Sequence, residues 1–269
     1  MGYLFDPANW EWVFAGRNFM FLVERFLNNI VLALITMALS LVLGLVIALL
    51  RISKNKVTST VTGIWIDIWR NLPVLLILLY FGLALPQEVK EFWVDIAPGF
   101  LPPQIRNNGQ VVASIIALTI YNSAVIAEIF RAGIQSLERG QGEAAAALGL
   151  THWKAMRIVI LPQGLRRMVP ATVSQLITLT KDTSLVSILA IQELVAAGSI
   201  VNNTSGSPFV GTGVPAPILQ VYILVGAMFV VFNLALSLLS RRLEVRERKR
   251  AGDVETVTGL EDQISIKPV

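Results

Sequence analysis

The sequence contains no cysteine, a single histidine and few charged residues. Without cysteine the chain has no disulfide, no thiolate metal site and no cysteine nucleophile. His152 alone cannot supply the several ligands that a structural metal site needs. Only 15% of the 269 residues are charged, whereas 54% are hydrophobic, and the hydrophobic residues occur in long blocks. A soluble domain of this size needs more polar surface, so the composition indicates a membrane protein.

Sequence motifs of catalysis are also missing. The chain has no GxxxxGK[ST] phosphate loop, no GxSxG nucleophile elbow and no HExxH pair. We therefore expect neither ATP hydrolysis nor any other enzymatic activity, and no cofactor or metal bound by this chain. The net charge of +4 is compatible with nucleic-acid binding, but most basic residues stand at the ends of apolar runs or in the tail. We expect no nucleic-acid partner, and we expect the basic run 241–250 to face anionic lipid headgroups.

Five apolar stretches are long enough to cross a bilayer, for which a helix of about 20 residues suffices. The second is interrupted by Arg70, Asn71 and Pro73, so we expect its helix to kink or restart there. The fourth is expected to break near 189 and to continue as a helical or irregular segment to 200. The sequence thus predicts an all-α membrane protein with five transmembrane helices. The predicted spans are approximately 26–50, 61–85, 111–129, 168–189 and 217–239.

The remaining segments differ in composition. Residues 1–25 are rich in aromatic side chains, which predicts a segment at the membrane interface. The stretch 86–109 contains four prolines and is predicted to be a long loop, as is 201–217. Residues 241–269 begin with the basic run and continue as a polar tail that we expect to be disordered. The predicted domains are 1–25, the permease domain 26–240 and the tail 241–269.

The distribution of Lys and Arg predicts the orientation in the membrane. With five spans, one side receives residues 51–56, 131–167 and the tail, which are all basic. The other side receives 1–25, 86–110 and 190–217, and the last of these contains no Lys or Arg. Basic loops remain in the cytoplasm. We therefore expect the N-terminus outside and the C-terminus inside.

The cytoplasmic segment 136–167 is predicted to be helical and water-exposed. Glu143, Ala144 and Ala145 begin a run of strong helix formers. Gly149 can end this helix by adopting a positive φ, and Leu161-Pro162 is expected to end a second short helix. A helix with a face of alanines presents a shallow ridge that can lie in a groove on another protein.

These residues carry a resemblance. Glu143-Ala-Ala, Gly149 and the run 159–162 resemble the EAA loop of ATP-binding-cassette importer permeases, although Val159 stands where isoleucine is usual. The surrounding sequence resembles the polar amino acid uptake branch of that family, and residues 26–242 fit its layout of spans and loops. The flanking matches are Ala127-Glu-Ile-Phe-Arg131, Gly140-Gln141, Leu161-Pro-Gln163 and Lys181-Asp-Thr-Ser-Leu185.

The resemblance implies a type I importer permease fold with a cytoplasmic coupling helix, in a bacterial cytoplasmic membrane. Its implied function is import of polar amino acids of the glutamate, glutamine, arginine and histidine class. It implies an ATPase subunit dimer that holds ATP and Mg, an extracytoplasmic amino acid-binding protein, and a second permease, identical or related. The residues implied in ATPase coupling are Gly140, Glu143, Ala144, Ala145, Gly149, Leu161 and Pro162.

Polar residues inside the spans are candidates for a translocation pathway. Lys181 and Asp182 lie roughly 16 Å along the helix from Pro170, near mid-bilayer. Ionisable residues there are costly unless they are paired or face a polar cavity. Thr183 and Ser184 can bond back to helix carbonyls and loosen the helix. The alternative for Lys181 and Asp182 is a salt bridge that only fixes packing.

Four further residues complete the pathway hypothesis: Arg70, Asn71, Asn122 and Glu128. For each of them a packing role is an alternative. Arg70 can pair with Asp67 and Glu128 with Arg131, and Asn122 can bridge two helices. A different function also stays open, an amino acid transporter driven by an ion gradient through Asp182 and Glu128. Such transporters are commonly built from inverted repeats, into which five spans do not divide evenly.

Overall fold

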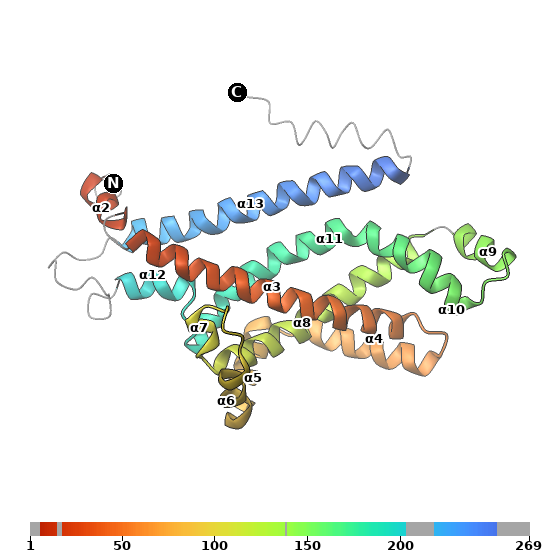
Figure 1. Ribbon diagram of the computed structural model, residues 1–269, viewed down its shortest axis with the longest axis horizontal. Helices are drawn as coiled ribbons and strands as arrows, with labels where there is room; N and C mark the ends of the chain where they lie inside the picture. Colours follow the sequence, from red (N-terminus) through yellow and green to blue (C-terminus); the bar gives the residue numbers. More distant parts are fainter. Residues whose placement is uncertain (1–5, 15–17, 138, 203–217, 252–269) are drawn as a thin grey trace. The chain divides into compact units, whose positions relative to one another are not determined.

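The structure is a computed structural model that describes residues 6–14, 18–137, 139–202 and 218–251 (Figure 1). Every regular element in these residues is a helix, which confirms the predicted all-α class. The elements are α2 (Pro7–Phe14), α3 (Asn18–Arg51), α4 (Lys56–Asn71), α5 (Val74–Ala84), α6 (Gln87–Ile96), α7 (Pro103–Arg106), α8 (Gln110–Gln135), α9 (Arg139–Ala147), α10 (His152–Ala155), the π-helix η1 (Met156–Ile160), α11 (Leu161–Asp182), the 3₁₀-helix η2 (Thr183–Leu189), α12 (Leu194–Asn202) and α13 (Ile218–Ala251).

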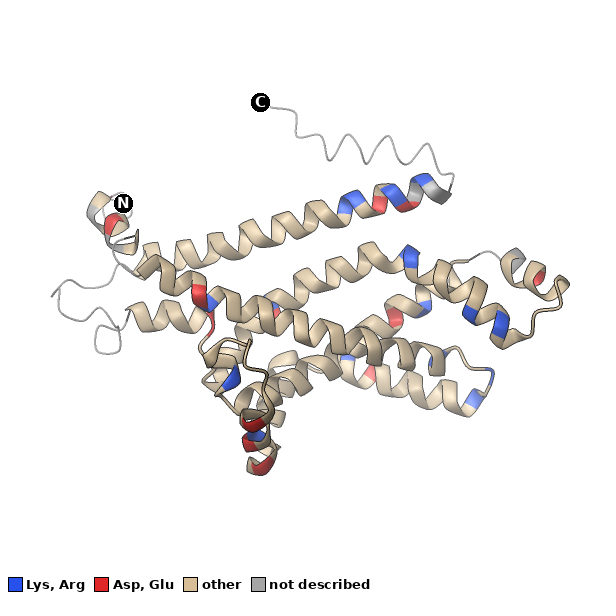
Figure 2. Ribbon diagram, viewed as in Figure 1, with Lys and Arg blue, Asp and Glu red and all other residues tan. Residues whose placement is uncertain are grey.

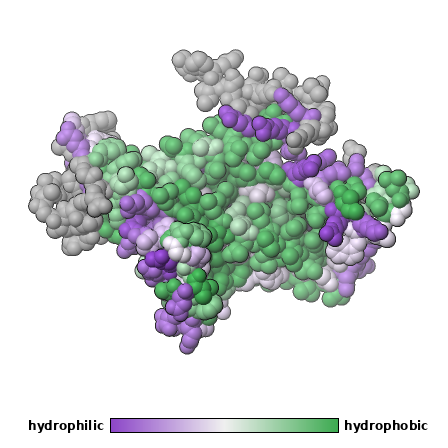
Figure 3. Space-filling model, viewed as in Figure 1, coloured by the Kyte–Doolittle hydropathy of each residue, from purple (hydrophilic) through white to green (hydrophobic). Residues whose placement is uncertain are grey.

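Three helices in the described part of the chain are individually long and apolar enough to cross a membrane. They are α3, α8 and the Ile218–Glu247 part of α13. Two broken helices also qualify, α4 with α5, and His152–Leu189 with Leu194–Val201. When each broken helix is counted as one span, the number reaches the predicted five. Apolar residues cover much of the visible helix surface (Figure 3), as a surface in contact with lipid requires.

The predicted interruption at Pro73 is a complete break in the helix. Leu72 and Pro73 both adopt extended backbone angles, with ψ of 138° and 127°. A residue that precedes proline avoids the helical region because the proline ring clashes with it. Helix α5 then restarts with the carbonyl of Pro73 accepting from the backbone N–H of Leu76 at 2.9 Å. The polar pair Arg70-Asn71 therefore ends α4.

The chain divides into two compact units. The first contains Met1–Met37, Pro73–Thr119 and Leu179–Asn233, and the second contains Ala38–Leu72, Ile120–Thr178 and Leu234–Val269. Helices α3, α8, α11 and α13 each contribute one part to either unit.

The core of the first unit is built around Phe26 on α3. Its ring meets Phe229 and Phe232 of α13 edge-on, with ring centroids 5.3 and 5.5 Å apart. Edge-to-face packing of this kind adds stability beyond the buried area. Leu22 of α3 and Leu194 of α12 are fully buried in the same cluster. The core thus joins α3, α12 and α13.

The prediction of a long loop over 86–109 is wrong, because this stretch forms α6 and α7. Its prolines do not break helices but precede or begin them, as Pro86 does for α6 and Pro102-Pro103 for α7. Proline suits a first turn, where its missing N–H has no helical partner to lose. The buried Lys90 of α6 donates from Nζ to the carbonyl of Gly82 at 2.8 Å.

The second unit is held by close helix contacts and by buried polar bridges. Gly44 of α3 lies so near α8 that an added Cβ would stand 2.6 Å from Cγ2 of Ile126. Asn122 of α8 is fully buried and accepts from Nε2 of Gln175 on α11 at 2.7 Å. Small residues at helix contacts and amide bridges between helices are typical of membrane bundles.

Two predicted boundaries differ from the structure. Helix α3 begins at Asn18, within the predicted interfacial segment 1–25, and Pro7–Phe14 of that segment form α2. Helix α13 continues through the basic run to Ala251, beyond the predicted start of the tail at 241. Acidic residues alternate with Arg and Lys at helical spacing there, which supports a helix. The rest of the tail, 252–269, and most of the predicted loop 201–217 lie outside the described residues.

Candidate functional site: the hairpin between α8 and α11

Helix α9 ends in a Schellman motif at Gly149, as the sequence predicts. Gly149 has a φ of +74° and donates its N–H to the carbonyl of Ala146 at 2.9 Å. The N–H of Leu150 donates to the carbonyl of Ala145 at 3.0 Å. These two bonds satisfy carbonyls that would otherwise be left at the helix end. A side chain at position 149 would strain this backbone, so glycine is required there.

The outer face of α9 is a ridge of small exposed side chains. Glu143, Ala144 and Ala146 are exposed, and Leu148 just beyond the helix is 81% exposed. Ala145 is buried and faces the rest of the second unit. Gly140 lies within α9. The geometry is that of a short, smooth helix available to a partner.

The second arm of the hairpin begins at α10 and runs without interruption into α11, so the prediction that Leu161-Pro162 ends this helix is wrong. Residues Met156–Ile160 form a π-helix, in which the N–H of Leu161 donates to the carbonyl of Met156. Proline in a regular helix clashes with the carbonyl four residues earlier. A π-turn shifts the carbonyls by one position and widens the helix, which accommodates Pro162 in the first turn of α11.

Two hydrogen bonds brace the hairpin against α11 and α8. Nε2 of Gln163 donates to Oε1 of Gln141 at 3.4 Å, which links the start of α11 to α9. Nη1 of Arg167 donates to the carbonyl of Ser136 at 3.0 Å, which links α11 to the end of α8. These two hydrogen bonds were not predicted from the sequence, although Gln141 and Gln163 belong to the matching motifs Gly140-Gln141 and Leu161-Pro-Gln163. These two bonds connect α11 to α9 and to the end of α8.

The intramembrane candidates Lys181 to Ser184 lie where α11 tightens into η2. The hydroxyl of Thr183 donates to the carbonyl of Thr180 and that of Ser184 to the carbonyl of Lys181, both at 2.7 Å. This back-bonding confirms the expected loosening, since the α-helix gives way to a 3₁₀-helix at this point. Lys181 is exposed and Asp182 half-buried. Helix α11 starts at Leu161 rather than near Pro170, from which their depth was counted.

A buried polar cluster that the sequence analysis missed holds the break between η2 and α12. The carboxylate of Glu193 accepts from the N–H groups of Val195 and Ala196 at 2.9 and 2.8 Å and thereby caps α12. It also accepts from Nδ2 of Asn29 on α3 at 3.0 Å. The same amide contacts Oγ1 of Thr183 at 3.2 Å, which brings a predicted pathway residue into the cluster. One acidic residue within an apolar stretch was the available signal.

Of the other pathway candidates, Asn71, Asn122 and Glu128 have hydrogen-bond or ion-pair partners within the second unit. Glu128 and Arg131 form the predicted ion pair, with Oε2 and Nη2 2.7 Å apart. Asn122 forms the helix bridge described above, as its packing alternative proposed. Arg70 and Asn71 are exposed, and Nδ2 of Asn71 donates to the carbonyl of Asp67 at 2.7 Å.

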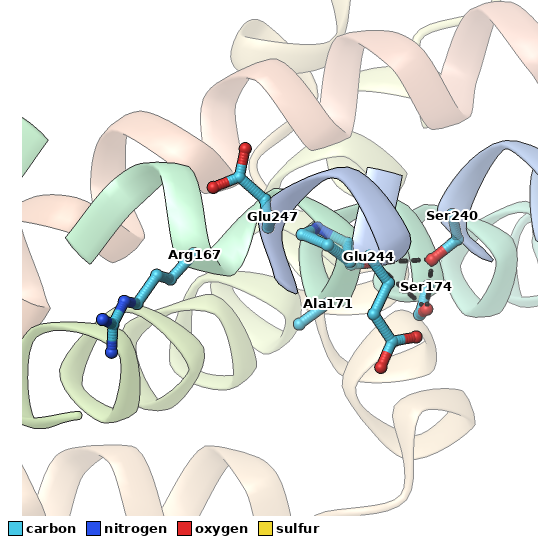
Figure 4. Close-up of a pocket in the computed structure, with 7 residues that line it drawn as sticks. Arg167, Ala171, Ser174, Ser240, Glu244 and Glu247 are labelled. Atoms are coloured by element: carbon cyan, nitrogen blue, oxygen red, sulfur yellow. Dashed lines mark hydrogen bonds between the residues drawn. The ribbon is translucent and has the colours of Figure 1, made fainter. Parts of the chain in front are cut away.

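A cavity of about 470 Å³ lies between α11 and α13 in the second unit (Figure 4). Among its lining residues, Oγ of Ser240 donates to the carbonyl of Pro170 at 2.9 Å. Ser174 lies beside it, with the two hydroxyls 3.1 Å apart. Charged side chains contribute to its lining, but none of the predicted coupling or pathway residues does. Its labelled lining residues are Arg167, Ala171, Ser174, Ser240, Glu244 and Glu247.

The described residues thus combine apolar helices that can cross a membrane with a capped, exposed helical hairpin, the arrangement expected of a membrane transport permease. Comparison with known proteins agrees, because residues 40–249 match the family described as binding-protein-dependent transport system inner membrane component. The chain belongs to this family, the membrane-embedded permease subunits of ATP-binding-cassette importers.

Individual relatives match over most of their length. A probable glutamine ABC transporter permease of Bacillus subtilis, GlnP, is 36% identical over 87% of this chain and 97% of its own. The glutamate/aspartate import permease GltK of Escherichia coli is 28% identical over 88% of this chain and 97% of its own. A crystal structure of an amino acid ABC transporter with histidines superimposes with a TM-score of 0.66 at 29% identity, covering 86% of this chain and 95% of that one.

Proposed function

We propose that the chain imports polar amino acids, of the class that includes glutamate, glutamine, arginine and histidine. The relatives support this substrate class, since their names specify glutamine, glutamate and aspartate, and arginine. Specificity within the class then depends in part on an extracytoplasmic binding protein that delivers the substrate. ATP and Mg are held by a separate ATPase dimer, because this sequence has no phosphate-binding loop.

The α9 ridge is the proposed docking element for the ATPase, and it is the observation that carries the proposal. Its exposed alanines fit a groove, and the Schellman motif at Gly149 fixes the direction in which the chain leaves it. When the ATPase subunits close on ATP, the ridge moves with them. The bonds from Gln163 to Gln141 and from Arg167 to Ser136 pass that movement to α11 and α8 as a rigid-body shift. The pathway then opens outward.

A second permease completes the pathway in this proposal. Two probable glutamine permeases of B. subtilis, GlnP and GlnM, both resemble this chain, at 36% and 32% identity. Two related permeases in one organism are compatible with a heterodimer, and a homodimer is the alternative. The orientation proposed is N-terminus outside and C-terminus in the cytoplasm, which places the α9 ridge on the ATPase side.

Lys181 to Ser184 are the proposed contact of the pathway with substrate. They combine a cation, an anion and two hydroxyls at the point where α11 loses its regular hydrogen bonding. A zwitterionic amino acid needs both charges and polar neighbours to leave water. Arg70, Asn71, Asn122 and Glu128 are proposed to position the helices around the pathway, since Asn71, Asn122 and Glu128 bond to other residues of the second unit.

Affinity purification of the full chain in mild detergent, followed by mass spectrometry, tests the assembly. We expect an ATPase, a binding protein and any second permease to be recovered. Glu143→Arg should release the ATPase and abolish uptake, whereas Asp95→Arg, which makes the same change in charge on exposed α6, should do neither. Uptake that persists with a hydrolysis-deficient ATPase and an intact ion gradient would instead establish the ion-driven alternative.

A further inference from the structure

A second cavity, of about 270 Å³, lies in the second unit where the end of α3 meets the second arm of the hairpin. Its apolar wall consists of Leu49 and Ile52 from α3 and its following turn, with Trp153 and Met156 from α10 and η1. Its polar wall consists of Ser53, Lys54 and His152. No carboxylate lines it. The cavity is therefore amphipathic, and its one formal charge is positive.

The walls of this cavity are held in place by hydrogen bonds of their own. Nη1 of Arg51 donates to Oγ and to the carbonyl oxygen of Ser59, each at 3.0 Å, and the hydroxyl of Ser59 donates back to the carbonyl of Arg51 at 2.6 Å. These bonds close the α3–α4 turn that carries Lys54. On the other side Thr151 caps α10, with its hydroxyl accepting from the N–H of Lys154 at 3.5 Å and its carbonyl from that of Ala155 at 2.8 Å. Lys54 and His152 are thus presented from two fixed turns.

Within the described part of the chain, the side chains of Lys54 and His152 are exposed and have neither a hydrogen-bond nor an ion-pair partner. The adjoining segments are also basic. Figure 2 shows Lys and Arg at the start of α4 and along α10 and η1, in the same unit. Trp153 is 73% exposed although it is large and partly apolar. Such a surface fits an anionic partner that also has an apolar part.

The position along α3 indicates which anion this is. Residues 26–50 carry no charge, and at about 1.5 Å per residue they span the hydrocarbon core. Leu49 then lies at the edge of the core, while Ser53 and Lys54 lie among lipid headgroups. Tryptophan prefers this depth, and basic pockets at the cytoplasmic surface bind anionic headgroups. A free phosphate ion would make no use of the apolar wall.

We propose that this cavity binds the headgroup of an anionic phospholipid from the cytoplasmic leaflet. Its phosphate lies between Lys54 and His152, and its glycerol and first acyl carbons lie against Leu49, Ile52 and Trp153. The inference takes one point from the proposed function, namely that the hairpin lies on the cytoplasmic side of the membrane. The bound lipid connects the end of α3 to the second arm of the hairpin, so the charge of the membrane stabilises the docked position of the hairpin.

The test uses the full permease complex in detergent and dibrominated phosphatidylglycerol or phosphatidylcholine, whose bromines quench nearby tryptophan fluorescence. Trp153 is one of six tryptophans in this chain. The quenching at this site is therefore measured as the part of the total quenching that disappears in the Trp153→Phe variant. We expect phosphatidylglycerol to quench that part at lower mole fraction than phosphatidylcholine. Lys54→Gln should raise the required mole fraction about fivefold, the effect of one surface charge. Lys56→Gln, exposed in the same turn but outside the cavity, should leave it unchanged.

Several outcomes would overturn the proposal. Equal quenching by both lipids, or an equal effect of Lys54→Gln and Lys56→Gln, would mean that the cavity selects no headgroup. Displacement of the lipid by inorganic phosphate at the same concentration would mean a site for the free anion. A Trp153-dependent signal that is present in the chain purified without the ATPase but absent from the full complex would mean that the partner protein fills the cavity. None of these measurements involves transport, so their failure is separate from a failure of the proposed function, which the Glu143→Arg uptake assay detects.

Discussion

The carboxylate of Glu193 and the side-chain amide of Asn29 lie 3.0 Å apart, and both residues are almost wholly buried. Asn29 and Glu193 are more than 160 positions apart in the sequence. Oδ1 of Asn29 also accepts from the N–H of Leu194 at 3.0 Å, so α3 and Glu193 together satisfy the first turn of α12. The break in the fourth span is therefore a fixed feature of the first unit.

Replacement of Glu193 by leucine should destabilise the first unit strongly. It removes the cap of α12 and leaves the N–H groups of Val195 and Ala196 without an acceptor, and the Asn29 amide keeps only its bond to Thr183. The expected loss in the free energy of unfolding is about 2–4 kcal/mol, since a cap and a buried charged hydrogen bond are both lost. Thermal unfolding of the purified complex measures it. Gln192→Ala, an exposed side chain one position earlier, is the control, and equal losses would refute the role of the cluster.

Gly149→Ala should impair coupling, because alanine at a φ of +74° costs roughly 1–2 kcal/mol. We expect α9 to fray at its end and ATPase-driven uptake to fall while the spans remain folded. Gly142→Ala is the matched control within the same helix. Nothing lies within 4 Å of its added Cβ, so this change should stabilise α9 by up to about 1 kcal/mol. If both variants behave alike in uptake, the Schellman motif has no part in coupling.

The contact between Gly44 and α8 should tolerate no side chain. An alanine Cβ would lie 2.6 Å from Cγ2 of Ile126 and 3.0 Å from the carbonyl oxygen of Ser123. We expect Gly44→Ala to lower the free energy of unfolding by about 1–3 kcal/mol. Gly226→Ala on α13, where no atom lies within 4 Å of the added Cβ, should not lower the free energy of unfolding. Ile126→Ala should relieve the clash only in part, because the Cβ of residue 126 is itself 2.9 Å away.

The bridge from Gln175 to Asn122 should show non-additive mutational effects. Gln175→Leu deprives a fully buried amide oxygen of a donor at 2.7 Å, with an expected loss of about 1–3 kcal/mol. The double variant Asn122→Leu with Gln175→Leu should lose less than the sum of the single variants, because no partner is left unsatisfied. Thermal unfolding of all three variants measures the coupling, and strict additivity would contradict the bridge.

Local patterns in the sequence predicted the features that depend on local physics. Apolar length predicted the spans, proline predicted the break at Pro73, and glycine predicted the turn at Gly149. The spacing of Glu128 and Arg131 predicted their ion pair. Each of these depends on residues that are close together in the chain.

The features that were missed depend on context. The prolines at 86 and 102 were interpreted as marks of a loop, although proline is equally suited to the start of a helix. Pro162 was expected to end a helix, and only the π-turn before it explains why the helix continues. The bond between Glu193 and Asn29 could not be predicted from local patterns because its acceptor and donor lie in different spans. Long-range polar pairing of this kind needs the three-dimensional structure.

The exposed apolar faces also determine how the cell must make this protein. Along α3 and α13, side chains such as Val42, Val46, Val231 and Leu234 are all at least half exposed. In water these faces would adhere to other chains before the two units could form. The nascent polypeptide must therefore enter the lipid bilayer as it leaves the ribosome. Copies that miss this insertion step are destined for aggregation and proteolysis rather than for later rescue.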